Sequence, residues 1–167
     1  MRTLRDAEYV EYVTARLPAL HRAAYLLCGG DAALADDIVQ TTITRLYQRW
    51  RRASRADNLD AYVHRMLVNT FVDEKRQDWS KVRLLPSVHG DVPSRTESTI
   101  EDRDALVAAL RTLPTRQRAV LVLRFLLDRP VEEVAEILEC SAGTVKSQTS
   151  RGLAVLRDQL VLKNHAG

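Results

Sequence analysis

Cysteine and histidine are scarce in this sequence. Its 167 residues include two cysteines, Cys28 and Cys140, and four histidines. The cysteines are far apart and form no CxxC pair, and the histidines show no metal-ligand spacing. The sequence therefore predicts no metal site, no cofactor and no disulfide framework. Both thiols are expected to be small buried side chains in a reducing cytoplasm.

Glycine, proline and aromatic residues are also few. Six glycines and five prolines are too few for a loop-rich β fold, and aromatic residues make up only 5% of the chain. Hydrophobic residues make up 46%, which is enough for a core. Leu, Ala, Arg, Glu and Val dominate the composition and favour helices. The sequence therefore predicts an all-α fold.

Long apolar runs are absent. No segment approaches the roughly 20 apolar residues that a membrane span requires. The first residues, MRTLRDAEYVEYV, alternate charged with apolar side chains and lack the apolar region of a signal peptide. We therefore expect a soluble, cytoplasmic protein with no membrane partner. The formal net charge of +3 is too small to identify an anionic partner by itself, so the placement of the charges matters more.

The spacing of apolar residues divides the chain into two small helical domains. It indicates three helices in residues 1–82, at 5–28, 31–50 and 59–79. It indicates four more in residues 100–167, at 100–110, 114–127, 130–138 and 141–160. Asp31 and Asn58 are placed to cap the helices that follow them. Residues 83–99 are rich in turn formers without a sustained period, which predicts a flexible linker.

The last two predicted helices have the spacing of a helix-turn-helix. Glu139 and Cys140 form the corner, Ala135 provides a small residue where the helices cross, and Val145 is an apolar anchor. The stripe expected to face the core comprises Val145, Thr149, Leu153, Leu156 and Leu160.

The opposite face of the last helix is small and basic, with no acidic residue from 142 to 152. An ordinary solvent-exposed face would more often carry Glu and Lys four residues apart. Small residues allow close approach to a DNA groove, and Lys and Arg reach phosphates or base edges. We interpret this face as DNA-binding. Its candidate residues are Ser141, Thr144, Lys146, Ser147, Ser150 and Arg151.

A second basic segment lies in the first domain. Residues 45–55 contain several arginines and no acidic residue, with Tyr47 and Trp50 among them. Basic and aromatic side chains together suit single-stranded DNA, which stacks its bases on aromatic rings. Helix packing explains Tyr47 and Trp50 better, so we expect these two rings in the core.

Three motifs in combination resemble the bacterial sigma factors of the extracytoplasmic-function (ECF) group. They are DIVQ at 37–40, R-x-x-x-N-x-x-x-D-x-x-R at 65–76, and GTVKS at 143–147 followed by Arg151. The first domain resembles region 2 of these proteins, and the second resembles region 4. The resemblance implies that the chain binds core RNA polymerase and directs it to promoters. Region 2 would contact the minus-ten element and region 4 the minus-thirty-five element.

The resemblance also assigns residues to these contacts. The polymerase-binding positions are Asp37, Gln40, Thr41 and Thr44. The minus-ten positions are Arg51, Arg52, Arg55, Asn58, Arg65, Asn69 and Arg76. The six candidate residues of the last helix would contact the minus-thirty-five element. Regulation by an anti-sigma factor is usual in the group, although no pattern in this chain indicates that partner. For Asp73 we favour a structural role, paired with Asn69 or Arg76 on its own helix.

Three positions depart from the family pattern. Glu139 stands at the corner where the family usually has glycine for a left-handed backbone, which predicts a strained turn costing about 1 kcal/mol. Thr41 follows DIVQ where the family usually has glutamate, and Tyr62 replaces a common tryptophan. The contacts of this chain are therefore expected to differ in detail from those of its relatives.

Two other classes of function were weighed. A helix-turn-helix regulator that acts without polymerase explains the last two helices but leaves DIVQ and the motif at 65–76 unexplained. An enzyme would need a nucleophile–base pair, a phosphate loop or a metal cluster, and the sequence offers none. We also expect the two domains to pack together in the free protein for at least part of the time, hiding binding surface.

Overall fold

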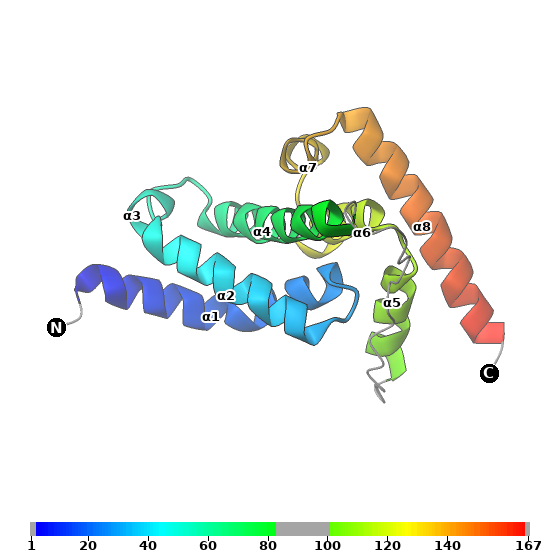
Figure 1. Cartoon of the computed structure of the whole chain (residues 1–167), viewed down its shortest axis with the longest axis horizontal. Coiled ribbons are helices and arrows are strands. Elements are labelled where there is room, and N and C mark those ends of the chain that lie inside the picture. The colour runs from blue at the N-terminus through cyan, green and yellow to red at the C-terminus, as the bar shows by residue number, and fades with distance from the viewer. Residues whose placement is uncertain (1–2, 83–100, 166–167) are drawn as a thin grey trace.

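The computed structural model describes residues 3–82 and 101–165, with side chains described at 3–75 and 105–161. The first range folds into α1 (Leu4–Leu27), α2 (Ala32–Gln48), α3 (Trp50–Ala53) and α4 (Leu59–Val82). The second range folds into α5 (Glu101–Arg111), α6 (Thr115–Leu121), η1 (Val122–Leu126), α7 (Val131–Leu138) and α8 (Ala142–His165). The predicted all-α fold is confirmed (Figure 1). The linker predicted at 83–99 lies outside the described residues.

The first domain packs α1 and α2 side by side with α4 against both (Figure 1). Its largest fully buried side chains are Leu27, Ile38, Leu46, Leu67 and Phe71. Asp31 accepts a hydrogen bond from the Leu34 amide at 3.1 Å, and Asn58 accepts one from the Ala61 amide at 3.0 Å. Both predicted N-caps are therefore confirmed.

The predicted helix at 31–50 is divided in two. α2 ends at Gln48, and the short helix α3 begins at Trp50. Trp50 is only 3% exposed and meets the Tyr9 ring edge-on, so its predicted core position is correct. The prediction for Tyr47 is wrong, because this side chain is 46% exposed. Its hydroxyl donates to Asp6 Oδ1 at 2.9 Å, which satisfies the phenol at the surface.

The second domain packs α8 against α5, α6 and α7. The helix predicted at 114–127 does not stay regular: α6 ends at Leu121, and η1 is a π-helical turn closed by the Leu127 amide on the Val122 carbonyl. The turn leaves Phe125 58% exposed, with its ring near the Arg124 guanidinium.

The core-facing stripe predicted for α8 is correct at its start and wrong at its end. Val145 is fully buried, whereas Leu160 is 39% exposed because α8 extends past the rest of the domain (Figure 1). Gly152, which the stripe did not include, is buried against α6. A Cβ at Gly152 would lie 3.0 Å from Leu121 Cδ1, so glycine permits the close approach of the two helices. No helix in the described ranges is long and apolar enough to cross a bilayer.

Candidate nucleic-acid and polymerase interfaces

The corner between α7 and α8 is left-handed. Glu139 has φ 54° and ψ 49°, the conformation that the family's glycine adopts most easily. The Cys140 amide donates to the Ala135 carbonyl at 2.9 Å and the Glu139 amide to the Glu136 carbonyl at 3.3 Å, which together form a Schellman motif. Glu139 therefore forms the same turn as glycine would in a helix-turn-helix, but its Cβ makes this left-handed backbone strained.

Replacing Glu139 with glycine is expected to raise the free energy of unfolding by about 1 kcal/mol, because glycine lacks the Cβ that disfavours this conformation. Urea unfolding followed by circular dichroism measures the change. The matched control is Glu139→Ala, which removes the carboxylate but keeps the Cβ and should bring no gain. An equal gain for alanine would assign the effect to the carboxylate and not to the backbone.

The start of α8 is capped by Ser141, as predicted. Its Oγ accepts from the Thr144 amide at 3.1 Å and lies 2.9 Å from the Thr144 hydroxyl. Ser147 and Ser150 are exposed beyond this cap, and Ser147 donates to the Thr144 carbonyl. The hydroxyls of Ser141 and Thr144 lie at the helix N-terminus, where backbone N–H groups and the helix dipole favour an anion.

The two basic residues of this face extend into solvent. Lys146 and Arg151 are both exposed. Val145, which is on the inner side of the same helix, is fully buried. Neither cation forms an ion pair with any residue that the structure describes. The structure thus brings the six predicted residues onto the N-cap and the first three turns of α8, with both charges available to a phosphate or a guanine edge.

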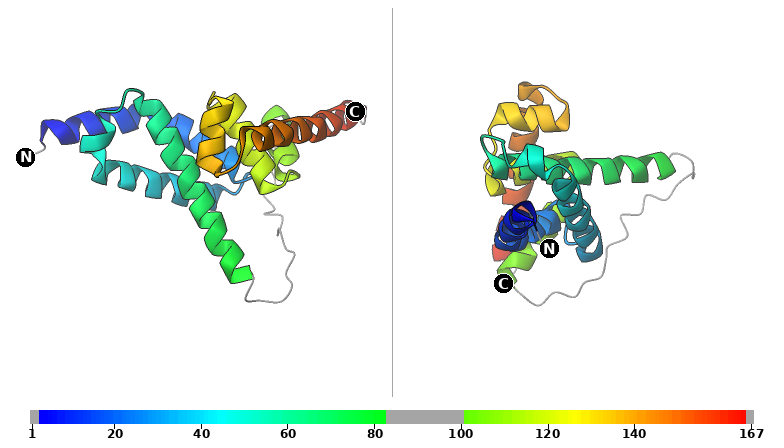
Figure 2. Two further views of the ribbon diagram at one scale, coloured as in Figure 1. Left: turned by 90° about the horizontal axis from the view of Figure 1, so that it is seen from above. Right: turned by 90° about the vertical axis from the view of Figure 1, so that its left-hand side faces the viewer.

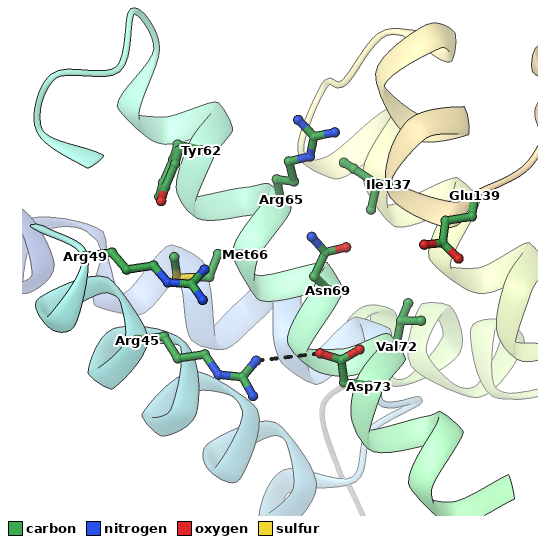
Figure 3. A pocket seen from close by; sticks show the side chains of 10 residues that line it. All are labelled: Arg45, Arg49, Tyr62, Arg65, Met66, Asn69, Val72, Asp73, Ile137 and Glu139. Atoms are coloured by element: carbon green, nitrogen blue, oxygen red, sulfur yellow. Dashed lines mark ion pairs between the residues drawn. The ribbon is translucent and has the colours of Figure 1, made fainter. Parts of the chain in front are cut away.

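The predicted minus-ten residues fall into two groups. Arg51 and Arg52 lie on α3 and Arg55 in the turn after it, all exposed, while Asn58 caps α4. Arg65 and Asn69 lie further along α4, on the wall of a cavity of about 550 Å³ (Figure 3). The structure does not bring Arg51, Arg52 and Arg55 to this cavity. The side chain of Arg76 lies outside the described residues.

Two arginines that the site prediction left out also line the cavity. Arg45 reaches it from α2, and Arg49 reaches it from the position directly after the end of that helix (Figure 3). The sequence could have predicted them, because both belong to the arginine-rich segment 45–55 and residues four apart share a helix face. The cavity thus gathers three arginines and an asparagine from α4, from α2 and from the C-cap of α2.

Of the two partners predicted for Asp73, Asn69 is wrong, and the side chain of Arg76 lies outside the described residues. Asp73 Oδ2 lies 3.7 Å from Arg45 Nη1 on α2, not against Asn69 on its own helix. Arg45 also donates to the Thr70 hydroxyl at 3.3 Å. The structural role expected for Asp73 is therefore kept, but it links α4 to α2 and orients one arginine of the cavity.

The start of α4 is fixed to α1 by a small polar cluster. Asp60 Oδ1 accepts from the Tyr12 hydroxyl at 2.6 Å and from Arg16 Nε at 2.9 Å. The hydrogen bond from Arg16 holds the pKa of the Asp60 carboxyl below its usual value, so the pair stays charged. One turn later, burial lowers the pKa of His64, and the positive charge of Arg129 lowers it further. These contacts fix the helix that carries Arg65 and Asn69.

The predicted polymerase-binding residues lie together on the outer face of α2. Asp37, Gln40 and Thr44 are exposed and Thr41 is half-buried, while the inner face of the same helix buries Ile38. Gln40, Thr41 and Thr44 line a shallow depression of about 370 Å³. The four residues therefore form one continuous stripe that is available to another protein.

Comparisons with known proteins agree with both halves of this arrangement. Residues 12–81 match the family model for sigma-70 region 2, and residues 103–156 match the model for sigma-70 region 4. The chain is 37% identical to an RNA polymerase sigma-E factor of Streptomyces coelicolor, over 94% of this chain and 88% of that protein. It is 30% identical to the ECF RNA polymerase sigma factor EcfG of Rhodopseudomonas palustris, over 86% and 80% of the two chains.

A solved structure shares the arrangement of helices. The sigma factor RpoE of Bartonella quintana, in complex with the anti-sigma factor NepR, superposes with a TM-score of 0.72 at 25% identity. The superposition covers 92% of this chain and 96% of RpoE. Together with the two region matches and the relatives named above, it shows that this chain belongs to the ECF group of sigma-70 family RNA polymerase sigma factors.

Proposed function

We propose that this sigma factor binds core RNA polymerase through the outer face of α2 and directs it to promoters through two DNA-binding surfaces. The exposed face of α8 contacts the minus-thirty-five element in the major groove. The arginine-lined side of α4 and α2, with the α3 loop beside it, contacts the minus-ten strand. The chain works in the cytoplasm by binding and not by catalysis, and an anti-sigma factor is a further partner.

The observation that carries this proposal is the presence of separate basic faces on the two domains of one chain. Lys146 and Arg151 project from α8, and Arg49, Arg65 and Asn69 lie on the first domain. Phosphates of duplex and single-stranded DNA bind such basic faces, and exposed side chains on the recognition helix can reach base edges. A helix-turn-helix regulator without polymerase would use only the first of these faces.

A run-off transcription assay with core RNA polymerase and a pool of genomic promoters tests the proposal. Transcripts that begin at defined sites only when the protein is added would support it. The protein alone is expected to bind promoter duplex poorly. Tight duplex binding by the protein alone, without any polymerase-dependent transcript, would favour the regulator instead.

The Arg151→Ala substitution is expected to weaken promoter use through the minus-thirty-five element by about 1–3 kcal/mol, or roughly 5- to 150-fold, if its guanidinium bonds a guanine edge. Transcript yield against promoter concentration measures the change. Arg157→Ala is the matched control, because Arg157 is an exposed arginine further along the same helix. Equal transcription by the unmodified protein from intact and mutated minus-thirty-five sites would contradict the assignment.

A further inference from the structure

The two domains pack against each other in the described residues, as expected. α1 of the first domain contacts α6 and η1 of the second, and α4 contacts α7 (Figure 2). Arg118 Nε donates to the Leu27 carbonyl at 2.7 Å, and Arg111 Nε donates to the Gly29 carbonyl at 2.8 Å. These contacts hold α7 beside α4, and the end of α7 supplies one side of the cavity of about 550 Å³.

The two sides of this cavity differ in charge. Arg45 and Arg49 enter it from α2 and its C-cap, whereas Ile137 and Glu139 enter it from the end of α7 (Figure 3). Asn69 lies between the two sides, on α4 (Figure 3). Sites for small molecules commonly have volumes of about 300–1,000 Å³. The cavity is therefore large enough for a ligand that has an anionic end and an end with N–H donors.

The positive side is suited to a phosphate group. Arg49 points into the cavity and forms no ion pair with any residue that the structure describes (Figure 3). Arg45 Nη1 lies 3.7 Å from Asp73 Oδ2, which is longer than the roughly 2.7–2.9 Å of a strong charge-assisted hydrogen bond. A guanidinium group can donate two parallel hydrogen bonds to a phosphate. Arg45 and Arg49 therefore have the donors to bind one phosphate group between them.

The lining between the charged residues is mostly apolar and includes one aromatic ring. Met66 is 8% exposed and Ile137 is 5% exposed, so the two domains both contribute apolar surface. Tyr62 is half-buried at the same cavity. Nucleobases stack on aromatic rings, and the amide of an asparagine such as Asn69 can both donate to and accept from a base edge. This combination suits a flat heterocyclic base.

The acidic side limits the length of the ligand. Glu136 Oε1 lies 2.8 Å from Arg65 Nη2, so this arginine already has a carboxylate partner. Glu139 places a second carboxylate on the same side (Figure 3). A nucleic acid strand, which carries a phosphate at every nucleotide, would be repelled by these carboxylates, whereas a single nucleotide has its phosphates at one end. The charges therefore favour a free nucleotide over a strand in this cavity.

We propose that the cavity between α4, α2 and α7 binds a free nucleotide. Its phosphate lies between Arg45 and Arg49, and its base lies against Tyr62. The edge of the base faces Asn69 and Glu139, whose side chains accept hydrogen bonds from its N–H groups. This site goes beyond the proposed function, which requires neither a small ligand nor α7 at this position.

Equilibrium dialysis of the full chain against the four common ribonucleoside diphosphates, ADP, GDP, CDP and UDP, tests the proposal. At least one of them is expected to bind, with one nucleotide per chain. Pyrophosphate alone and the matching nucleoside alone should each bind at least about tenfold more weakly, because each lacks half of the contacts. No binding of any diphosphate at millimolar concentration would overturn the proposal. Pyrophosphate that binds as tightly as the nucleotide would overturn the contact with the base.

The phosphate contact is tested with Arg49→Met, which keeps an unbranched apolar side chain but removes the guanidinium. Affinity for the nucleotide is expected to fall about tenfold or more, the usual effect of losing hydrogen bonds to a charged group. Arg22→Met is the matched control, because Arg22 is an exposed arginine of α1 that does not line the cavity. Its affinity should stay within about twofold of the unmodified value. An unchanged affinity in the Arg49 variant, or an equal loss in the control, would overturn the phosphate position.

The contact with the base is tested with two variants of Tyr62. Tyr62→Leu removes the ring and is expected to weaken nucleotide binding roughly 5- to 150-fold, the usual effect of losing one stacked base. Tyr62→Phe keeps the ring and should retain the affinity, and urea unfolding checks that both variants are folded. Equal affinities of the two variants would overturn the stacking. Because these titrations use the free protein, a missing promoter-specific transcript would count against the proposed function alone.

Discussion

Replacing Asp37 and Gln40 together with alanine is expected to lower the affinity for core RNA polymerase by about 100-fold. Each side chain is exposed on α2, and neither side chain is hydrogen-bonded to another described residue. Hydrogen bonds to a charged partner contribute about 1.5–3 kcal/mol each, and a loss near 3 kcal/mol is about 100-fold in affinity. Because both substitutions lie outside the core, helix content and the free energy of unfolding should stay unchanged.

A fluorescence titration of labelled protein with core polymerase measures the loss. The matched control is Glu11→Ala, which removes an exposed carboxylate from α1, a different helix. Unchanged affinity in the double variant, or an equal loss in the control, would place the polymerase contact on another surface.

Features that depend on neighbouring residues in the chain were predictable from the sequence. The caps at Asp31, Asn58 and Ser141 each bind a backbone amide three residues ahead, so the residue type and the start of an apolar period were enough to predict them. The turn at Glu139 was also predictable, since it lies between two periodic segments, whereas its left-handed backbone was expected only from the glycine that the family usually has there.

Features that depend on packing between distant segments were not predictable. Arg118 and Leu27 are 91 residues apart in the chain, and Arg111 and Gly29 are 82 apart. The sequence indicated that Gly29 ends a helix, but only the packed domains reveal that arginines use the carbonyl groups there. Asp73 was assigned to its own helix for the same reason, because nothing in the local pattern placed Arg45 beside it.

The aromatic residues of the first domain illustrate a second limit. Tyr47 and Trp50 lie three residues apart, which predicts one shared face if the helix continues. The chain instead leaves α2 at Gln48 and begins α3 at Trp50. Trp50 therefore enters the core, while Tyr47 stays at the surface bonded to Asp6. A single interruption of the helix was enough to separate two residues that periodicity had grouped.

The Phe71→Ala substitution is expected to lower the free energy of unfolding by about 3–5 kcal/mol, the usual loss when a buried phenylalanine leaves a cavity. Phe71 is 1% exposed and lies on the core side of α4, two residues beyond the exposed Asn69. Stabilities of small domains are commonly about 5–15 kcal/mol, so this loss would remove a large part of the total. Urea unfolding followed by circular dichroism measures it.

Two matched variants on the same helix separate folding from function. Phe71→Leu fills most of the volume and should lower the free energy of unfolding by no more than about 1.5 kcal/mol, with transcription kept. Asn69→Ala should change the free energy of unfolding by no more than about 0.5 kcal/mol, because the side chain is exposed, yet weaken minus-ten-dependent transcription. A loss below about 1 kcal/mol for Phe71→Ala would contradict the packing of α4 on α1 and α2. Full transcription by the Asn69 variant would remove that residue from the proposed strand site.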